Sequence, residues 1–203
     1  MTRLGWGILG LILVTLVGFL SLTSFGVTDG SRIRAALTRA PAPVPASIAA
    51  APMPGGPGLI VPVSGVARAA LYDSWGDARD GGTRQHHGTD IPAPAGTPVI
   101  AAAPGRVEKL FQSAAGGTTL YVRSPDGRWT YYYAHLAGYA PGVHEGMAVT
   151  TGDSLGFVGD TGDAGAGNFH LHFGMARMQP GEHWWQGTDV DPFPLLAAGR
   201  LPG

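Results

Sequence analysis

Short runs of hydrophobic residues, separated by Gly, Pro and Asp, fill the chain from Leu59 to its end. Few stretches long enough for a helix are free of Gly or Pro, and short runs bounded by such residues are typical of strands. Pro125-Asp126-Gly127 predicts a hairpin turn. A mainly antiparallel, all-β fold follows from this succession. The pattern predicts seven strands, over residues 99–103, 106–112, 118–123, 129–136, 144–149, 154–158 and 170–175.

The amino-terminal residues follow a different pattern. Residues 4–22 are almost wholly apolar and Arg3 precedes them. Nineteen residues come close to the roughly 20 that a membrane-spanning helix needs, whereas the apolar core of a cleaved signal peptide is shorter, at about 7–15 residues. We therefore expect one apolar helix, an uncleaved signal anchor, over residues 1–22. Three arginines downstream compete with Arg3 for the cytoplasmic side, so charge alone does not orient the helix.

A linker connects this segment to the rest of the chain. Residues 40–57 contain six prolines and six alanines. Such a composition favours an extended chain at about 3.1 Å per residue, which gives a reach on the order of 50 Å. We assign residues 23–58 to this Pro/Ala-rich linker and residues 59–203 to one globular domain. A chain of 203 residues is long enough for one domain with a hydrophobic core.

Charge and cysteine content exclude several classes of function. The net charge is −1, and from Leu59 onward nine basic residues face thirteen acidic ones. An acidic domain is poorly suited to the phosphate backbone of nucleic acids, so no nucleic-acid partner is expected. The chain contains no cysteine. Disulfides, thiolate metal sites, a cysteine nucleophile and a lipidated cysteine anchor are therefore excluded.

Two short motifs carry residue types that bind zinc. The first is His86-x-x-x-Asp90 with Gly88 at its centre, and the second is His170-x-His172. In an extended chain alternate side chains share a face, so each motif would present its polar residues on one side. Gly88 would leave space there for an ion. A catalytic zinc usually has three protein ligands and one open position. His86, Asp90 and one of the two later histidines would supply the three ligands.

The chain resembles the lysostaphin-type zinc endopeptidases (LytM-like domains), which cut peptide bonds in bacterial peptidoglycan. The resemblance runs from about residue 59 to residue 196 and includes several motifs, whose order is more specific than any single motif. These are RQHHGTDI at 84–91, GTPV at 96–99, GRV at 105–107, YYAHL at 132–136, GDSLG at 152–156, GDTG at 159–162, HLHF at 170–173 and VDP at 190–192.

The resemblance implies a fold and a set of residue roles. The fold would be a β-rich, barrel-sandwich domain with a groove across a sheet. His86, Asp90 and His172 would be the zinc ligands, and His135 and His170 the two catalytic histidines that do not bind the metal. The three remaining histidines of the domain are expected to be non-ligands: His87, His144 and His183.

The expected reaction is hydrolysis of a peptide bond by attack of zinc-bound water. The helical His-Glu-x-x-His motif is absent, so no glutamate base is provided by that motif. Histidine titrates near neutral pH, and we assign His135 and His170 to proton transfer and to stabilisation of the oxyanion, without dividing the two roles. Strict alternation predicts that His135 lies on the face shared by Tyr131 and Tyr133.

Two positions depart from the pattern of the family. Phe169 occupies a position where the family often has proline, and Gly174 one where it often has an acidic residue. Neither is a ligand position. The departures therefore concern loop shape and substrate fit rather than metal binding.

Two other functions stay open. One is a non-catalytic regulator of cell-wall hydrolases on the same fold, although such regulators typically lose ligands that this chain retains. The other is a carrier domain of the biotinyl or lipoyl type, which needs a lysine in a tight turn. The single lysine of the chain, Lys109, is predicted to lie within a strand.

Partners and location follow from the expected substrate. Peptidoglycan peptides would be the substrate, and the bond could be a D-alanyl cross-link or a glycine bridge. The membrane would be contacted through the amino-terminal helix, and a regulatory protein partner and the oligomeric state stay open. The domain would lie in the cell envelope outside the membrane, or be secreted if the amino-terminal segment is cleaved.

Overall fold

The structure, a computed structural model, describes residues 58–203. The expected signal anchor at residues 1–22 and all of the linker except its last residue lie outside the described residues. None of the helices in residues 58–203 has the length and hydropathy of a membrane span.

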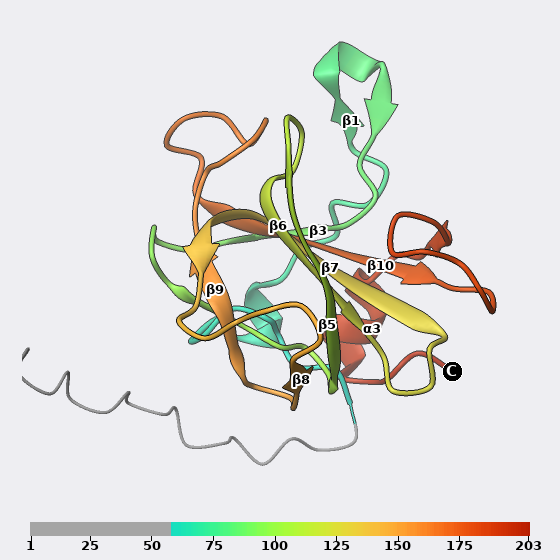
Figure 1. Cartoon of the computed structure of the whole chain (residues 1–203). Helices are drawn as coiled ribbons and strands as arrows, with labels where there is room; N and C mark the ends of the chain where they lie inside the picture. Colours follow the sequence, from blue (N-terminus) through green and yellow to red (C-terminus); the bar gives the residue numbers. More distant parts are fainter. Residues whose placement is uncertain (1–57) are drawn as a thin grey trace, which may run out of the picture. The chain divides into compact units, whose positions relative to one another are not determined.

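The domain is built around one large antiparallel sheet (Figure 1). Six strands follow one another across it in the order β11-β10-β7-β6-β5-β8, and β3, β4 and β9 join at the sides. Their bounds are β3 Thr89–Pro92, β4 Pro98–Ile100, β5 Gly105–Ser113, β6 Gly117–Arg123, β7 Trp129–Tyr139, β8 Ala148–Val149, β9 Ser154–Val158, β10 His170–Arg177 and β11 Thr188–Asp189.

Smaller elements surround the sheet. A two-stranded hairpin of β1 (Ala78–Arg79) and β2 (Arg84–Gln85) projects beyond the sheet (Figure 1). The helical elements of the described part are short: η1 Arg68–Ala70, η2 Asp80–Gly82 and α3 Phe193–Ala198. The expectation of a mainly antiparallel β domain is therefore confirmed for residues 58–203.

The long strand β7 changes neighbours halfway along its length. Its first half lies between β6 and β10, and its second half pairs with β9, beginning at Leu136 opposite Val158. On the other side of β10, β3 pairs with the same part of the strand that carries the two histidines. The strands β3, β10 and β7 therefore lie side by side, close to the point where β7 changes its partner from β6 to β9.

The hydrophobic core lies against one face of these strands. Tyr131 and Tyr133 of β7 and Leu171 and Phe173 of β10 are buried there, and the rings of Tyr133 and Phe173 pack edge to face with centroids 5.3 Å apart. Each fully buried side chain of this size contributes about 1.5–3 kcal/mol. The intervening residues of both strands, such as His172, face the opposite side of the sheet. Burial of one face thus fixes which side chains are available to a site on the other face.

Most of the predicted strands are present, with shifted ends. The predicted strand at 144–149 is wrong over residues 144–147, because the chain turns there with Gly146 at φ 84° and only Ala148–Val149 pairs with β5. The predicted strand at 99–103 ends early, at Ile100. The hairpin turn is confirmed, since Gly127 has φ 73° and its N–H donates to the carbonyl of Ser124 at 3.0 Å.

Candidate metal centre

Three predicted ligand residues come from two neighbouring strands and the segment before one of them. Asp90 lies in β3 and His172 lies directly opposite it in β10, so the two side chains share a face of the sheet. His86 lies in the connection between β2 and β3. Its backbone is fixed on both sides, because its N–H donates to Asp77 O at 2.9 Å and its carbonyl accepts from Gly76 N–H at 2.8 Å.

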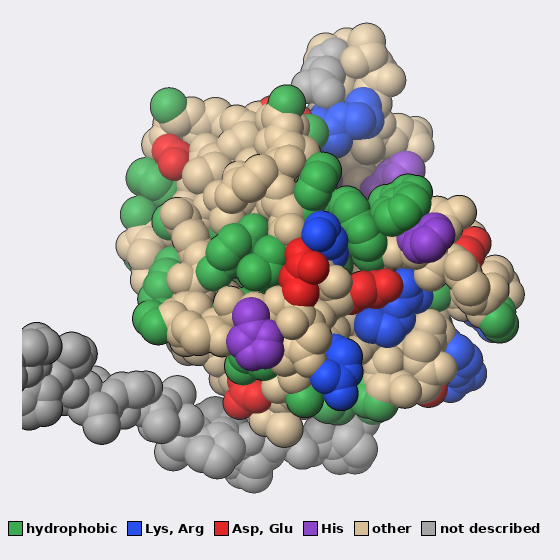
Figure 2. Space-filling model, viewed as in Figure 1, with side chains coloured by type: hydrophobic (Ala, Val, Ile, Leu, Met, Phe, Trp, Pro, Cys, Tyr) green, Lys and Arg blue, Asp and Glu red, His purple; other side chains and the backbone are tan. Residues whose placement is uncertain are grey.

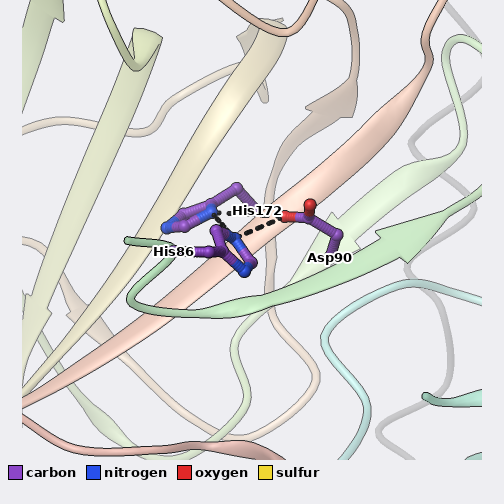
Figure 3. A group of neighbouring side chains, drawn as sticks. All are labelled: His86, Asp90 and His172. Carbon is purple, nitrogen blue, oxygen red and sulfur yellow. Dashed lines mark hydrogen bonds and ion pairs between the residues drawn. The ribbon is translucent and has the colours of Figure 1, made fainter. Parts of the chain in front are cut away.

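The three side chains point toward one another (Figure 3). His86 Nε2 lies 2.8 Å from His172 Nδ1 and 3.0 Å from Asp90 Oδ1, and His172 Nδ1 lies 3.2 Å from the same oxygen. Nitrogen and oxygen ligands about 2.0–2.1 Å from a tetrahedral zinc ion would be separated by about 3.3 Å. The triangle formed by the three atoms is close to that size, and among the described residues it is the group suited to a metal.

Hydrogen bonding shows that these groups fit a cation. His86 Nδ1 lies 2.6 Å from the carbonyl oxygen of Ser74, which can only accept, so this nitrogen carries the proton. In the neutral imidazole, Nε2 then presents a lone pair to the carboxylate of Asp90. Two acceptors 3.0 Å apart repel each other unless a proton or a metal ion lies between them. Two imidazoles and one carboxylate form a donor set typical of zinc.

Electrostatics favour the metal-binding protonation states. Burial lowers the pKa of His172, which keeps the imidazole neutral. Burial alone would raise the pKa of Asp90, but its contacts with His172 and His86 outweigh this effect and hold the pKa well below the usual range. Asp90 is therefore a carboxylate beside the neutral imidazole of His172, and these are protonation states that bind a metal.

Two residues that the sequence did not indicate hold the ligands in place. The hydroxyl of Ser74 accepts a hydrogen bond from Asp90 N–H at 3.0 Å, while its carbonyl orients His86. Arg79 of β1 donates from Nη2 to Asp90 Oδ2 at 2.5 Å, leaving Oδ1 directed at the two histidines. Both contacts are made by segments without a repeating pattern, so no periodicity in the sequence could have revealed them.

Gly88 is required by the packing of His172. A Cβ atom at residue 88 would lie 2.6 Å from His172 Cε1 and 2.9 Å from the carbonyl oxygen of Phe173. The sequence predicts that Gly88 leaves space for an ion, but the structure shows a different neighbour at this position. The space is occupied by the imidazole of His172 itself.

The two predicted catalytic histidines lie beside the triangle. His170 Nε2 is 3.7 Å from Asp90 Oδ1, and the rings of His170 and His135 are 4.8 Å apart. His170 Nδ1 donates to Asn168 O and His135 Nδ1 donates to Thr161 O, both at 2.8 Å. Because a carbonyl only accepts, each Nδ1 is protonated and each Nε2 is left as the acceptor. Burial lowers the pKa of His135, which keeps this ring neutral near pH 7.

The predicted orientation of His135 is wrong, and a bulge in β7 explains why. Between Tyr133 and Leu136 the strand advances three residues while β6 advances two, and His135 has φ 60°. The additional residue reverses the alternation. His135 therefore lines the groove together with Ala134, while Tyr131 and Tyr133 remain in the core.

A groove pocket of about 200 Å³ contains the five predicted site residues. Its walls are the β1–β2 hairpin, the turn between β5 and β6, and the segment between β9 and β10. Arg84 of the hairpin and Asp163 of the last segment form an ion pair of 2.7 Å, which joins two of these walls. The hydroxyl-bearing ring of Tyr132 lies on the floor beside His172, with ring centroids 5.7 Å apart.

The remaining predictions concern residues outside the triangle. His87 pairs with Asp189 at 2.8 Å and stacks on Trp75, and His144 and His183 lie in turns. None of the three belongs to the metal-suited group of residues 58–203. Lys109 lies within β5, as predicted, and pairs with Glu145.

Comparison with known proteins gives a family and several relatives. The family model described as "Peptidase family M23" matches residues 84–192. The "L-Ala--D-Glu endopeptidase" of Bacillus subtilis is 39% identical over 131 residues, which is 62% of this chain and 39% of that protein. The "Peptidoglycan DD-endopeptidase ShyC" of Vibrio cholerae is 34% identical over 93 residues, 46% of this chain and 21% of that protein. The chain thus spans less than half the length of these curated relatives.

Solved structures share the fold. The catalytic domain of lysostaphin from Staphylococcus simulans matches with a TM-score of 0.53 at 29% identity, over 62% of this chain and 90% of that one. A putative glycyl-glycine endopeptidase LytM from Ruminococcus gnavus also matches with a TM-score of 0.53 at 29% identity, over 72% of this chain and 62% of that one. The resemblance noted from the sequence motifs is confirmed.

Proposed function

The chain belongs to peptidase family M23, and on that premise we propose that it is a zinc-dependent endopeptidase acting on the stem peptides or cross-links of peptidoglycan. The observation that carries this proposal is the convergence of His86 Nε2, Asp90 Oδ1 and His172 Nδ1 to within 3.2 Å of one another. His135 and His170 lie in the same pocket. The proposal therefore includes both the ligands and the residues for proton transfer.

The three converging atoms would hold the metal. A zinc ion bound there would polarise the scissile carbonyl and make hydroxide available near neutral pH. Ser74 orients His86 and Asp90, and Arg79 occupies the second oxygen of Asp90, so that the carboxylate offers one oxygen to the site. Orienting contacts of this kind are a regular part of metal sites.

The other two histidines would move the protons. Each has Nδ1 bound to a backbone carbonyl, so each presents Nε2 to the pocket. One imidazole takes a proton from the attacking water as the oxygen bonds to the carbonyl carbon, and that proton then goes to the amide nitrogen as the C–N bond breaks. The other, when protonated, donates to the oxygen that becomes negative in the tetrahedral intermediate.

The substrate class is supported by the relatives. One is named an L-Ala–D-Glu endopeptidase and another a peptidoglycan DD-endopeptidase, so peptide bonds of peptidoglycan are a common target although the bond differs. We place the domain in the cell envelope because its substrate is there. The alternative of a non-catalytic regulator has less support, because the three ligand residues and both further histidines are retained.

The test is hydrolysis of purified peptidoglycan by the full chain with zinc added. We expect release of soluble fragments that a chelator abolishes and that His86→Ala and His170→Ala each reduce by several orders of magnitude. His144→Ala, which changes an exposed histidine outside the pocket, should retain activity. If both site variants hydrolysed peptidoglycan as fast as the unaltered chain, the proposal would be rejected. Mass spectrometry of fragments from defined muropeptides would identify the bond.

A further inference from the structure

A second pocket of about 460 Å³ adjoins the metal centre. It shares Arg84, Tyr132 and His172 with the first pocket, so the two form one continuous groove. Its volume lies within the range of sites that bind small molecules. The second pocket is therefore within reach of a polymer bound at the metal centre.

Two small residues of β10 make the pocket hollow. Gly174 lies opposite Tyr132 of β7, and Ala176 lies opposite Thr130. A Cβ atom at residue 174 would lie 3.3 Å from the Tyr132 ring, so any longer side chain there would enter the pocket. The absence of a side chain at residue 174 therefore leaves part of the hollow open.

The floor of the pocket carries a buried hydroxyl with no partner. Thr130 is 2% exposed, it lines the pocket, and its Oγ1 has no hydrogen-bond partner in the structure. A buried polar group without a partner is unfavourable, because it has lost its hydrogen bonds to water. A ligand with a hydroxyl or amide group would supply the missing hydrogen bond.

Aromatic side chains form the opposite wall. The ring of Trp184 lies 4.7 Å from that of Tyr121 and 5.2 Å from that of Trp185, which is 60% exposed. The space-filling view shows hydrophobic side chains at several places on this face, one group of them beside a histidine (Figure 2). The negative face of an aromatic ring attracts C–H groups that carry partial positive charge, and those on a pyranose ring have this character.

The charges of the pocket disfavour an ionic ligand. Asp189 is paired with His87 at 2.8 Å, and Arg84 is paired with Asp163 at 2.7 Å. Asp189 and Arg84 thus each already have a partner, so neither is left to balance the charge of an ionic ligand. Gln186 and Thr130 offer neutral hydrogen-bonding groups. The lining therefore suits a neutral, polar ligand with an apolar face.

We propose that this pocket is a subsite for an N-acetylated sugar ring of the glycan strand, positioned beside the peptide that is cut. The proposed function identifies the polymer as peptidoglycan, and this inference rests on it to that extent. The residues that line the pocket indicate a neutral, polar ligand with an apolar face. The apolar face of the ring stacks on the tryptophans, and a hydroxyl or acetamido group bonds to Thr130 Oγ1. Peptides that carry their sugar would then be preferred to the same peptides without it.

The test measures binding rather than hydrolysis. A β-1,4-linked tetramer of N-acetylglucosamine is titrated into the full chain by calorimetry, with cellotetraose as the comparison lacking acetamido groups. We expect the acetylated tetramer to bind more tightly. Thr130→Val, which keeps the shape of the side chain, should weaken binding about threefold to tenfold. Trp184→Ala should weaken it about tenfold or more.

A matched control separates binding from folding. Thr89 also has a buried Oγ1 without a partner, but it lies opposite Phe173 and lines neither pocket. Thr89→Val should leave tetramer binding unchanged, and neither Val variant should lower the melting temperature.

Absence of tetramer binding, or equal binding in Thr130→Val, Trp184→Ala and the unaltered chain, would overturn the subsite. Cleavage of sugar-free peptides in that case would leave the proposed peptidase function intact. Tetramer binding without any zinc-dependent hydrolysis would support the subsite and reject the peptidase.

Discussion

Ser74 contacts two of the three converging side chains through different atoms. Its carbonyl accepts from His86 and its hydroxyl accepts from the N–H of Asp90. Ser74→Ala removes the second contact and keeps the first. Because groups that orient ligands typically contribute 10–100-fold to metal affinity, we expect zinc affinity to fall about tenfold, as measured by competition with a chromogenic chelator. Ser64→Ala, at a half-buried serine outside the pocket, is the control. Unchanged affinity in Ser74→Ala would contradict the role of the hydroxyl.

A substitution at Gly88 tests whether the packing around His172 tolerates an added methyl group. Alanine at this position would place a methyl group against the ring of His172 and the backbone of Phe173. We expect a loss of about 1–3 kcal/mol in the free energy of unfolding, together with weaker zinc binding. Gly138→Ala introduces the same methyl group into open space, without a positive φ, and should be neutral in both measurements. If Gly88→Ala matched Gly138→Ala in both the free energy of unfolding and zinc binding, β3 and β10 would have to separate easily.

At the scale of elements, the bulge in β7 decides where His135 points. His135 has φ 60°, a conformation that Asn adopts more readily than a β-branched residue. We expect both His135→Asn and His135→Val to be inactive, with the Asn variant more stable by about 1–2 kcal/mol in urea denaturation. The same pair of substitutions at His144, which lacks a positive φ, should show no comparable preference. A Val variant as stable as the Asn variant would indicate that the bulge relaxes without cost.

The elements also show what could be predicted from the sequence. Asp90, His170 and His172 lie in regular strands, and simple alternation places them on one face as expected. Alternation fails at His135, where one additional residue in β7 reverses the face. His135 nevertheless lines the pocket that contains the three expected ligands. The family motifs had implied a role for this residue without regard to the direction of its side chain.

Other features depend on tertiary contacts that no periodicity records. Ser74 and Arg79 reach Asp90 from turns and a two-residue strand, so their contacts depend on how distant segments pack. The second pocket depends on the combination of Gly174 and Ala176 with a loop that carries two tryptophans. The sequence indicated Gly174 as a departure, but only the register of β10 against β7 shows what the missing side chain leaves open.

At the scale of the whole molecule, zinc should stabilise a domain that folds without it. The core is formed by buried residues on the opposite face of the sheet, so metal removal does not remove it. At a free zinc concentration about 100 times Kd, binding should add about 2.7 kcal/mol, or roughly 5–10 °C in melting temperature. His172→Ala should melt at the same temperature with and without zinc. Unfolding of the unaltered chain by a chelator at room temperature would contradict an independently stable core.

Main-chain carbonyls fix the tautomers of three histidines. His86, His135 and His170 each donate Nδ1–H to a carbonyl, from Ser74, Thr161 and Asn168 respectively. Since every residue type carries a carbonyl, replacement of those three side chains would not by itself remove the acceptors. The path of the backbone therefore determines which ring nitrogen of each histidine carries the proton. Residues 74, 161 and 168 can change in evolution without altering these tautomers, provided that the backbone keeps its path.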